Sequence, residues 1–587
     1  MRVACMFGEI GITGKLEGWR VSARRETSAP GLEFIHLALE SPVPAVPPRL
    51  LLEWRTPQLD MQFRWHPMGR FNRAIPADWG GSVDSNLASS APVMQLYGGD
   101  GGNRLLFAVS EAKRQVRIKA GVCEESCEIA CSVELFTVPE APLASYETIL
   151  RLDARKIFCA DAVRETFDWF AALPGYTPAP IPEAAYEAIY SSWYSYHQDV
   201  FAKPLEAECA LARQFGMKGI IVDDGWQTDD NNRGYAFCGD WEISKNRFPD
   251  MRAHVEAVHR LGMKYVVWFS VPFVGDRSAN RARFEGKYLY RIPRLDTAVL
   301  DPRFPEVREF LIAIYETSLR EWDIDGFKLD FIDCFRFDGD DPAVKENYAG
   351  RDIKSLPEAV DRLLSETMAR LERIKPGILI EFRQSYIGPA IRKYGNMIRV
   401  GDCPGDFLSN RVGMVDLRLS SGNTAVHSDM LEWHPADTAE TAALQLLNVL
   451  FCVPQISVRL EAVPEAHRAM LKFWLGFWRE HRDTLLHGKL TPLHPELNYP
   501  VVSAETAKEA VTAIYGSGQC VKIPGHPGRT CWVVNAGGDS GLVLDLPAQP
   551  LAAERFDVTG RSVPGVLPGL GISRVLVPPS GLLKLQF

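Results

Sequence analysis

The sequence lacks the marks of a membrane, secreted or nucleic-acid-binding protein. No apolar run approaches the roughly 20 residues that span a bilayer, and residues 1–19 hold no apolar segment between a basic head and a small-residue cleavage site. We therefore predict a cytoplasmic location. The 65 Lys and Arg against 74 Asp and Glu give a net charge of −9. This charge disfavours nucleic acids and anionic membranes as partners and is compatible with a neutral ligand such as a sugar.

Cysteine and histidine form neither a disulfide framework nor a metal-binding pattern. The 12 Cys are scattered, several of them inside apolar stretches. Cys123, Cys127 and Cys131 recur every four residues, but no second Cys or His pair follows at the spacing of a zinc finger. His427 and His434 have no third ligand at a suitable spacing. We expect no metal and no cofactor.

The pattern of apolar residues changes twice along the 587 residues, which predicts three domains. Short alternating segments predict an N-terminal β-sandwich with a linker helix over residues 1–172. After a proline-rich stretch, apolar strands alternating with amphipathic helices predict a catalytic (β/α)8 barrel over 183–485. Strand patterns return over 490–587, where we expect a small antiparallel β domain. The predicted fold class is a multidomain α/β chain around a TIM barrel.

Eight apolar segments are the predicted barrel strands. In chain order they are AIYSSWYSY, GIIVDDGW, KYVVWFS, GFKLDF, ILIEFRQ, MIRVGD, NTAVHSDM and QISVRLE. Catalytic groups of such barrels project from the carboxyl ends of the strands. Six of the eight segments end in polar residues, so we expect a site at this end of the barrel.

Lys328 and Asp330 lie two residues apart in the fourth segment and therefore point to the same side of the strand. A carboxylate beside a fixed cation stays ionised, with a lowered pKa, and this suits nucleophilic attack. A plain salt bridge at the barrel end is the alternative interpretation.

Asp402 ends the sixth segment, just before Pro404 and Gly405 turn the chain. It lies two strands beyond Asp330, and carboxyl groups on nearby strand ends can face each other across a substrate. A gap of roughly 5 to 5.5 Å would make them the couple of a retaining glycosidase. Asp406 is the competing acid, and an unrelated turn residue is the alternative for Asp402.

Asp223 and Asp224 end the second segment and are followed by Gly225 and Trp226. Carboxylates accept hydrogen bonds from pairs of sugar hydroxyls, while an indole covers the apolar face of the ring. Capping of the next helix by Asp224 is the simpler interpretation.

Further indoles and polar residues near the strand ends together favour a carbohydrate cleft, although any one indole is more often part of a core. The residues are Trp193, Trp241, Trp268 and Trp433, with Glu381, Arg383 and Gln384 at the end of the fifth segment, where a structural ion pair is equally expected.

These segments resemble the bacterial α-galactosidases (melibiases) of glycoside hydrolase family 36. The runs DDGWQ, GDWEISKNRFPD, LGMKYVVWFS, LDPRFPEVREFL and GFKLDF look like that family's successive barrel motifs in the same order. The flanking β domains match its layout. The resemblance implies Asp330 as the nucleophile and Asp402 as the acid and base.

The resemblance also implies a sugar-binding set. Asp223, Asp224 and Lys328 would hold galactosyl hydroxyls, and Trp193 and Trp226 would line the pocket. We add Trp268 and Arg383 to the predicted substrate-binding residues. The chain departs from the family in the fifth segment, where EFRQSYIGP replaces a Cys-Ser-Gly-rich loop. It departs again just before Asp402, where Val400 or Gly401 stands at places that are often Trp and Ser in the family.

The predicted function is that of a retaining, exo-acting α-galactosidase that forms a covalent glycosyl-aspartate on a galactoside or oligosaccharide substrate. The alternatives are a related α-glycosidase, such as an α-glucosidase or α-N-acetylgalactosaminidase, and a transglycosylase that passes the galactosyl group to another sugar. A non-catalytic carbohydrate-binding barrel is a third alternative, but it would not need both carboxylates. The natural substrate and the oligomeric state, a homo-oligomer included, stay open.

Overall fold

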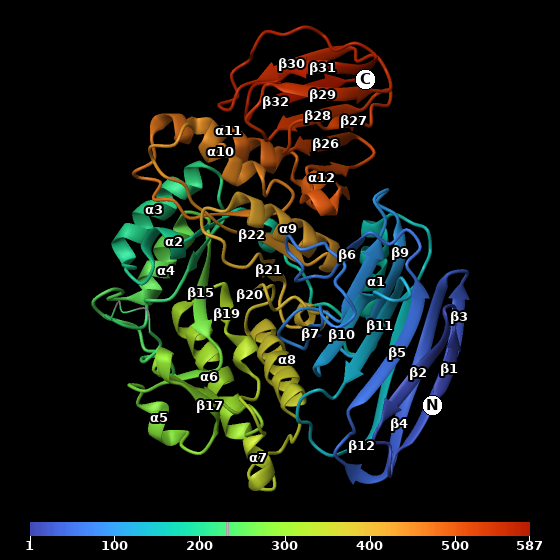
Figure 1. The fold of residues 1–587 in the computed structure, drawn as a ribbon. Helices are drawn as coiled ribbons and strands as arrows, with labels where there is room; N and C mark the ends of the chain where they lie inside the picture. Colours follow the sequence, from blue (N-terminus) through green and yellow to red (C-terminus); the bar gives the residue numbers. More distant parts are fainter. Residues whose placement is uncertain (231, 233) are drawn as a thin grey trace.

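The computed structural model describes residues 1–230, 232 and 234–587. Three β-rich bodies follow one another along the chain: a sandwich, a closed barrel and a second pair of sheets (Figure 1). Among the described residues, no helix is both long and apolar enough to cross a bilayer.

Two six-stranded antiparallel sheets form the N-terminal sandwich, as the alternating segments predicted. In β4 (Leu32–Ala45) the side chains of Ile35, Leu37 and Leu39 are buried at every second position, so one face of the strand joins the core. The first sheet has the order β1 (Arg2–Cys5), β2 (Gly8–Gly14), β5 (Leu50–Pro57), β11 (Glu128–Leu135), β10 (Val116–Cys123), β7 (Val83–Ser85). The second has the order β3 (Arg20–Ala29), β4, β12 (Leu143–Asp153), β9 (Asn103–Val109), β8 (Val93–Tyr97), β6 (Phe63–Trp65). Helix α1 (Cys159–Ala172) follows.

Eight parallel strands close into the predicted barrel, in the predicted order. They are β13 (Ile189–Ser191), β14 (Gly219–Val222), β15 (Lys264–Ser270), β19 (Gly326–Asp330), β20 (Leu379–Arg383), β21 (Met397–Arg399), β22 (Ala425–Leu431) and β23 (Val453–Ile456). The first strand is shorter than predicted, because 193–196 forms the helical turn α2 (Trp193–Tyr196). The hydroxyl of Ser457 accepts hydrogen bonds from the backbone N–H groups of Tyr194 and Ser195 in this turn. Tertiary contacts here override the strand preference of the aromatic residues.

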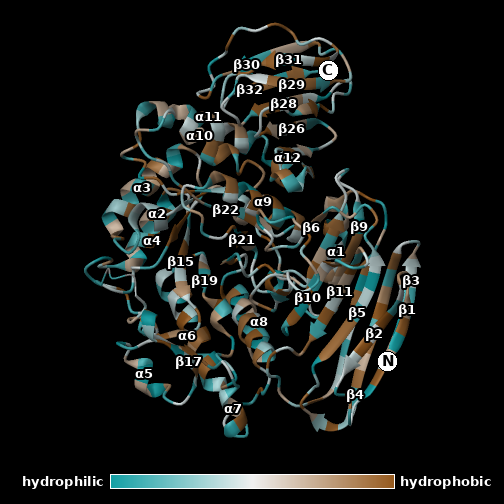
Figure 2. Ribbon diagram, in the orientation of Figure 1, coloured by the Kyte–Doolittle hydropathy of each residue, from teal (hydrophilic) through white to brown (hydrophobic). Residues whose placement is uncertain are grey.

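Amphipathic helices surround the barrel. In α8 (Leu356–Ile374) the buried residues recur at three- and four-residue intervals, which places one apolar face against the strands. Figure 2 shows both hydropathy colours on the helices around the barrel, as this pattern requires. The other long helices are α3 (Ala202–Gln214), α4 (Met251–Arg260), α6 (Pro305–Trp322), α9 (Phe407–Ser420), α10 (Ala439–Leu447) and α11 (Glu465–Glu480).

A small sheet and several short helices lie in the segments that connect or flank the barrel strands and long helices. A three-stranded sheet between β15 and β19 has the order β16 (Phe273–Gly275), β18 (Thr297–Leu300), β17 (Tyr288–Ile292). The short helices are α5 (Asn280–Arg283), α7 (Pro342–Lys345), α12 (Arg482–His487), η1 (Glu183–Tyr186), η2 (Pro293–Leu295), η3 (Ile332–Cys334), η4 (Ile391–Lys393) and η5 (Pro495–Leu497).

The C-terminal body consists of two sheets that are mixed rather than antiparallel throughout. The larger has the order β24 (Lys489–Leu493), β25 (Val501–Glu505), β26 (Glu509–Ile514), β28 (Thr530–Asn535), β32 (Leu582–Gln586), β30 (Ala552–Phe556). The smaller is β27 (Cys520–Lys522), β29 (Gly541–Leu546), β31 (Gly571–Leu576). Strands β26 and β28 are parallel, as are β27 and β29. The chain passes through β27 of the smaller sheet between β26 and β28, so it re-enters the larger sheet in the same direction.

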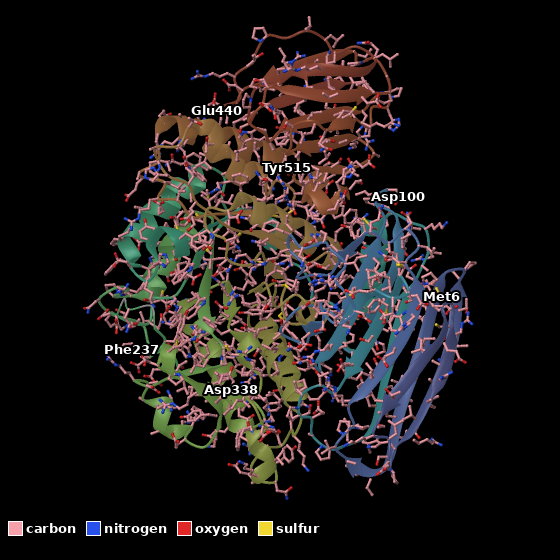
Figure 3. The ribbon with its side chains drawn as sticks, viewed as in Figure 1. Met6, Asp100, Phe237, Asp338, Glu440 and Tyr515 are labelled. Carbon is pink, nitrogen blue, oxygen red and sulfur yellow. The ribbon has the colours of Figure 1, made fainter. Side chains whose placement is uncertain are left out.

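Helix α9 joins the three bodies. The carboxylate of Asp416 accepts hydrogen bonds from the indole of Trp65 (2.8 Å) and the phenol of Tyr499 (2.7 Å), and it pairs with Arg73 (3.1 Å). All four side chains are buried. Figure 3 labels Tyr515 at a second contact of the C-terminal body, where its hydroxyl donates to the Leu447 carbonyl (3.2 Å).

Candidate active site

Four hydrogen bonds hold the carboxylate of Asp330, the last residue of β19. Its Oδ1 accepts from the hydroxyl of Tyr386 (2.6 Å), from Nε of Arg383 (2.8 Å) and from the backbone N–H of Phe331 (2.7 Å). Its Oδ2 accepts from the indole Nε1 of Trp268 (3.1 Å). One oxygen is therefore saturated with donors, and the other keeps one lone pair free.

The cation directly bound to Asp330 is Arg383 rather than Lys328. Nζ of Lys328 pairs instead with Oδ2 of Asp223, so this ion pair joins β19 to the end of β14. Burial raises the pKa of Asp330, but Arg383 and then Lys328 outweigh it, and the pKa lies well below its usual range. Asp330 is consequently an anion at neutral pH.

Asp223 and Asp224 lie at the end of β14, both only 2% exposed. The backbone N–H of Asp223 donates to the hydroxyl of Ser192 (3.0 Å), and its Oδ1 accepts from the N–H of Asp224 (2.9 Å). The two oxygens of Asp224 accept from the amides of Gln198 and Gln227, each at 2.6 Å. Burial raises the pKa of Asp224 to about 6. Neutral amides orient this carboxylate without cancelling its charge.

Asp402 lies three residues beyond β21, with 53% of its side chain exposed. Its Oδ1 accepts from Nη2 of the buried Arg399 (2.8 Å), which also pairs with Asp429 at the seventh strand. Partial desolvation raises the pKa of Asp402, but Arg399, then Lys328 and Arg383, lower it below its usual value. Lys328 and Arg383 also lower the pKa of Asp330. Asp330 and Asp402 therefore share two cations at the carboxyl ends of the barrel strands, which we call the barrel mouth.

Asp406, the competing acid, caps a helix. Its Oδ1 accepts from the backbone N–H of Ser409 (2.9 Å), in the first turn of α9. This is the usual arrangement of an N-cap aspartate. Asp406 is therefore committed to the start of α9.

The carboxylates form a gradient of exposure from the barrel interior to its rim. Asp223 and Asp224 are buried, Asp330 is 7% exposed, and Asp402 is open to solvent. A sugar bound along this gradient would place one end deep in the barrel and the other toward solvent.

The predicted sugar platform Trp226 is instead core. Its side chain has no exposed surface, its Nε1 donates to the Trp268 carbonyl (2.9 Å), and its ring packs against Trp241 and Trp322. The prediction that Trp226 lines the pocket is therefore wrong, because packing between strands and helices determines which way it faces.

The other indoles have three different environments. Trp268 is 2% exposed and holds Asp330, so it positions the carboxylate rather than presenting a face to a ligand. Trp433 donates to Nδ1 of His467 on α11 (3.1 Å). Trp193 is half-buried in α2, with its ring 4.5 Å from that of His197.

Two further polar residues at the fifth strand have structural roles. Glu381 is fully buried inside the barrel, and its Oε2 accepts from the amide of Gln455. Oε1 of Gln384 accepts from the backbone N–H of Gly401 (3.0 Å), which connects the fifth and sixth strand ends. In the part of the chain that the structure describes, no group of three or more His, Cys, Asp or Glu is placed to hold a metal ion.

Four residues of this site were missed in the sequence. Tyr386 binds Asp330; Arg399 binds Asp402 and Asp429; and Tyr194 donates to Oδ2 of Asp429 (2.9 Å). Period-two spacing is the available signal, since Asp429 lies two residues beyond His427 in β22. The phenols have no such signal, because they come from turns.

A family model described as Melibiase matches residues 180–336. Among curated proteins, a 1,4-α-glucan branching enzyme of Mycobacterium bovis is 29% identical over 279 residues, which cover 42% of this chain and 35% of that enzyme. Alpha-galactosidase 1 of Pediococcus pentosaceus is 28% identical over 137 residues, covering 22% of this chain and 18% of that protein. The chain thus spans about a third or less of the length of these relatives.

Solved structures match over nearly the whole chain. A family 36 α-galactosidase of Geobacillus stearothermophilus, in complex with 1-deoxygalactonojirimycin, superposes with a TM-score of 0.65 at 14% identity, covering 98% of this chain and 83% of that one. An α-galactosidase of Lactobacillus brevis has a TM-score of 0.63 at 14% identity, covering 100% and 87%. The chain therefore has the fold of the family 36 α-galactosidases, with a Melibiase match over residues 180–336, as the motifs predicted.

Proposed function

We propose that the chain is a retaining, exo-acting α-galactosidase with Asp330 as nucleophile and Asp402 as acid and base. The observation that carries the proposal is the environment of Asp330, an anion fixed by four donors at the end of the fourth strand. The Melibiase match covers β14, β15 and β19, the strands of Asp223, Trp268 and Asp330. Support for galactose as the sugar comes from that match and from the α-galactosidases among the relatives.

In the first step, Oδ2 of Asp330 attacks the anomeric carbon while the bond from that carbon to the leaving oxygen breaks. Oδ2 is the nucleophilic atom because it has one donor, whereas Oδ1 has three. Asp402 gives its proton to the leaving oxygen, so the departing group is a neutral alcohol. Solvent exposure at Asp402 leaves room for that alcohol.

In the second step, the carboxylate of Asp402 takes a proton from water, and the oxygen of that water attacks the anomeric carbon. The ester bond to Asp330 breaks, and galactose leaves with its α configuration. Nη2 of Arg399 holds this carboxylate in place for the proton transfer (2.8 Å). Arg383 and Tyr386 stabilise the carboxylate as Asp330 departs.

Sugar recognition is assigned to the buried end of the exposure gradient. Asp223 and Asp224 would accept hydrogen bonds from the 4- and 6-hydroxyls of galactose, with Lys328 donating beside them. A glucoside presents its 4-hydroxyl in the other direction and would lose a hydrogen bond to one of these charged carboxylates, which costs about 1.5 to 3 kcal/mol. A terminal sugar held this deep, with the acid at the rim, fits cleavage from the chain end.

A panel of p-nitrophenyl α-glycosides tests the proposal, with the α-glucoside as the matched competitor because of the similarity to branching enzymes. We expect kcat/KM for the α-galactoside to exceed that for the α-glucoside by orders of magnitude. Equal or faster turnover of the glucoside would overturn the sugar assignment and leave the two carboxylates in place. Transfer of the galactosyl group to added sugars, followed by product analysis, separates a transglycosylase from a hydrolase.

A further inference from the structure

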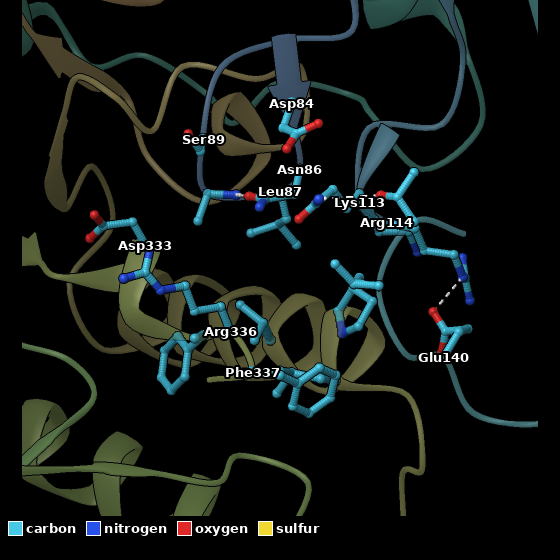
Figure 4. Close-up of a pocket in the computed structure, with 18 of the residues that line it drawn as sticks. Asp84, Asn86, Leu87, Ser89, Lys113, Arg114, Glu140, Asp333, Arg336 and Phe337 are labelled. Carbon is cyan, nitrogen blue, oxygen red and sulfur yellow. Dashed lines mark hydrogen bonds and ion pairs between the residues drawn. The ribbon is translucent and has the colours of Figure 1, made fainter. Parts of the chain in front are cut away.

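A cavity of about 680 Å³ lies between the N-terminal sandwich and the barrel, outside the mouth described above. Figure 4 shows Asp84, Asn86 and Leu87 of the sandwich on one side of it, and Arg336 and Phe337 of the loop after β19 on the other. The start of α8 closes its base, through Leu356 and Val360. The volume lies within the range of small-molecule sites.

The charges that line the cavity balance. The acids are Asp84, Glu140 and Asp333, and the bases are Lys113, Arg114 and Arg336. Most are already paired, since Asp84 binds Arg117 (2.7 Å), Lys113 binds Glu358 (2.9 Å) and Arg114 binds Glu140 (3.0 Å; Figure 4). No cluster of one sign is available for a phosphate or a cation. The lining therefore favours a neutral ligand.

Aromatic and hydrogen-bonding groups occur together on the barrel side. Phe335 and Phe337 are half-buried, so part of each ring faces the cavity. Asp333 and Arg336 also line the cavity, and Arg336 is exposed. Rings together with planar polar side chains are the combination that binds sugars.

The cavity also contacts the segments that hold the nucleophile. Asp333 lies in η3, three residues after Asp330, and Ser385 lies two residues after Arg383. The Ser385 carbonyl accepts a hydrogen bond from the N–H of Ser90 in the sandwich (2.9 Å). A ligand in the cavity would touch both segments without touching the sugar at the mouth.

We propose that this cavity is a second binding site, and that its ligand is a neutral oligosaccharide. The ligand class rests on the proposed function, whereas the position of the site rests on the lining alone. An oligosaccharide bound here would keep the protein attached to its carbohydrate substrate while the active site at the barrel mouth releases a product.

The test is isothermal titration of the full chain carrying Asp330→Asn, which prevents turnover, with raffinose as the probe. We expect two molecules of raffinose per chain. Val138→Trp should obstruct the cavity with an indole, because Val138 lines it with 39% of its surface exposed, and should reduce the number to one. Val43→Trp is the matched control, at an exposed valine of the same sandwich away from the cavity (64%), and should keep two.

Arg336→Ala provides an independent variant, since this exposed side chain can be removed without opening a core. It should weaken the second site about tenfold by loss of a charged hydrogen bond and leave the first unchanged. One raffinose per chain in the parent, or two in Val138→Trp, would overturn the proposal. Hydrolysis of p-nitrophenyl α-galactoside by the unmodified chain is measured separately. If the chain binds two raffinose molecules but does not hydrolyse this substrate, the proposed function is rejected and the proposal of a second binding site stands.

Discussion

Asp330 has two unlike oxygens, and this difference determines what each donor contributes to catalysis. When the glycosyl ester at Oδ2 breaks, its electron pair returns to Oδ2, and the charge is shared across the carboxylate with Oδ1, which accepts from Tyr386, Arg383 and Phe331. A donor placed there helps the carboxylate leave and holds it in position. The donors of Oδ1 should therefore matter most in the second chemical step.

Tyr386→Phe tests this assignment at nearly constant volume. We expect kcat for an activated aryl α-galactoside to fall about 10- to 100-fold, the value of one charged hydrogen bond, with a burst of phenol showing that the intermediate accumulates. Tyr394→Phe is the control, because it removes a buried hydrogen bond to Asp361 (2.7 Å) outside the site. Loss of activity in both variants, or no burst in Tyr386→Phe, would contradict the assignment.

Asp224 predicts a pH dependence. Burial raises its pKa to about 6, so above this pH it is a carboxylate that accepts from sugar hydroxyls, and below it the acid form loses that capacity. As pH falls through about 6, kcat/KM should fall as well. In Asp224→Asn, kcat/KM at neutral pH should be about 10- to 100-fold lower, and the limb near pH 6 should disappear. Persistence of that limb would assign it to another group.

At the scale of elements, helix α9 and strand β21 give two neighbouring carboxylates different roles. Asp402 follows β21 and binds Arg399, whereas Asp406 caps α9 through Ser409. The residues are four apart in sequence, and both appear polar and turn-like. Their roles depend on which backbone groups each one meets.

Asp402→Ala should abolish turnover of natural galactosides and spare the first step with a dinitrophenyl galactoside, whose leaving group needs no proton. Added azide should restore turnover and give the α-galactosyl azide. Asp406→Ala should instead lower the free energy of unfolding by about 1 kcal/mol and keep most of the activity. Azide rescue of Asp406→Ala, with Asp402→Ala active, would exchange the two roles.

The sequence predicted elements better than partners. The period of two in GFKLDF placed Asp330 at a strand end, and all eight barrel strands follow the predicted order. The facing of Trp226 and the pairing of Lys328 with Asp223 were not predictable, since both depend on contacts between strands distant in sequence. The roles of Arg399 and Asp429 were not predicted from the sequence for the same reason. The parallel strand pairs of the C-terminal sheets arise because the chain alternates between the two sheets, and a local sequence pattern does not predict this connection.

At the scale of the whole molecule, one buried carboxylate connects the three bodies. Asp416 of α9 binds Trp65 and Arg73 of the sandwich and Tyr499 of the C-terminal body. Arg73 is 3% exposed, so loss of its partner would leave a buried charge uncompensated. The junction should therefore be sensitive to substitution far from the mouth.

Asp416→Asn should lower the free energy of unfolding by about 3 to 5 kcal/mol, the cost of breaking a buried ion pair, as measured by urea denaturation. Glu366→Gln is the control, because it removes an exposed pair with Arg362 (3.2 Å), and it should cost less than about 1 kcal/mol. Equal effects of the two substitutions would show that the junction does not connect the bodies.

The central claim, that Asp330 forms a bond to the sugar, is tested most directly by trapping the intermediate. An activated fluoro-galactoside, which forms the ester quickly and loses it slowly, should inactivate the chain. Mass spectrometry of the digested protein should place one added sugar on Asp330, and Asp330→Asn should take up none. An adduct on Asp402 or elsewhere, or no adduct together with a product of inverted configuration, would contradict the account.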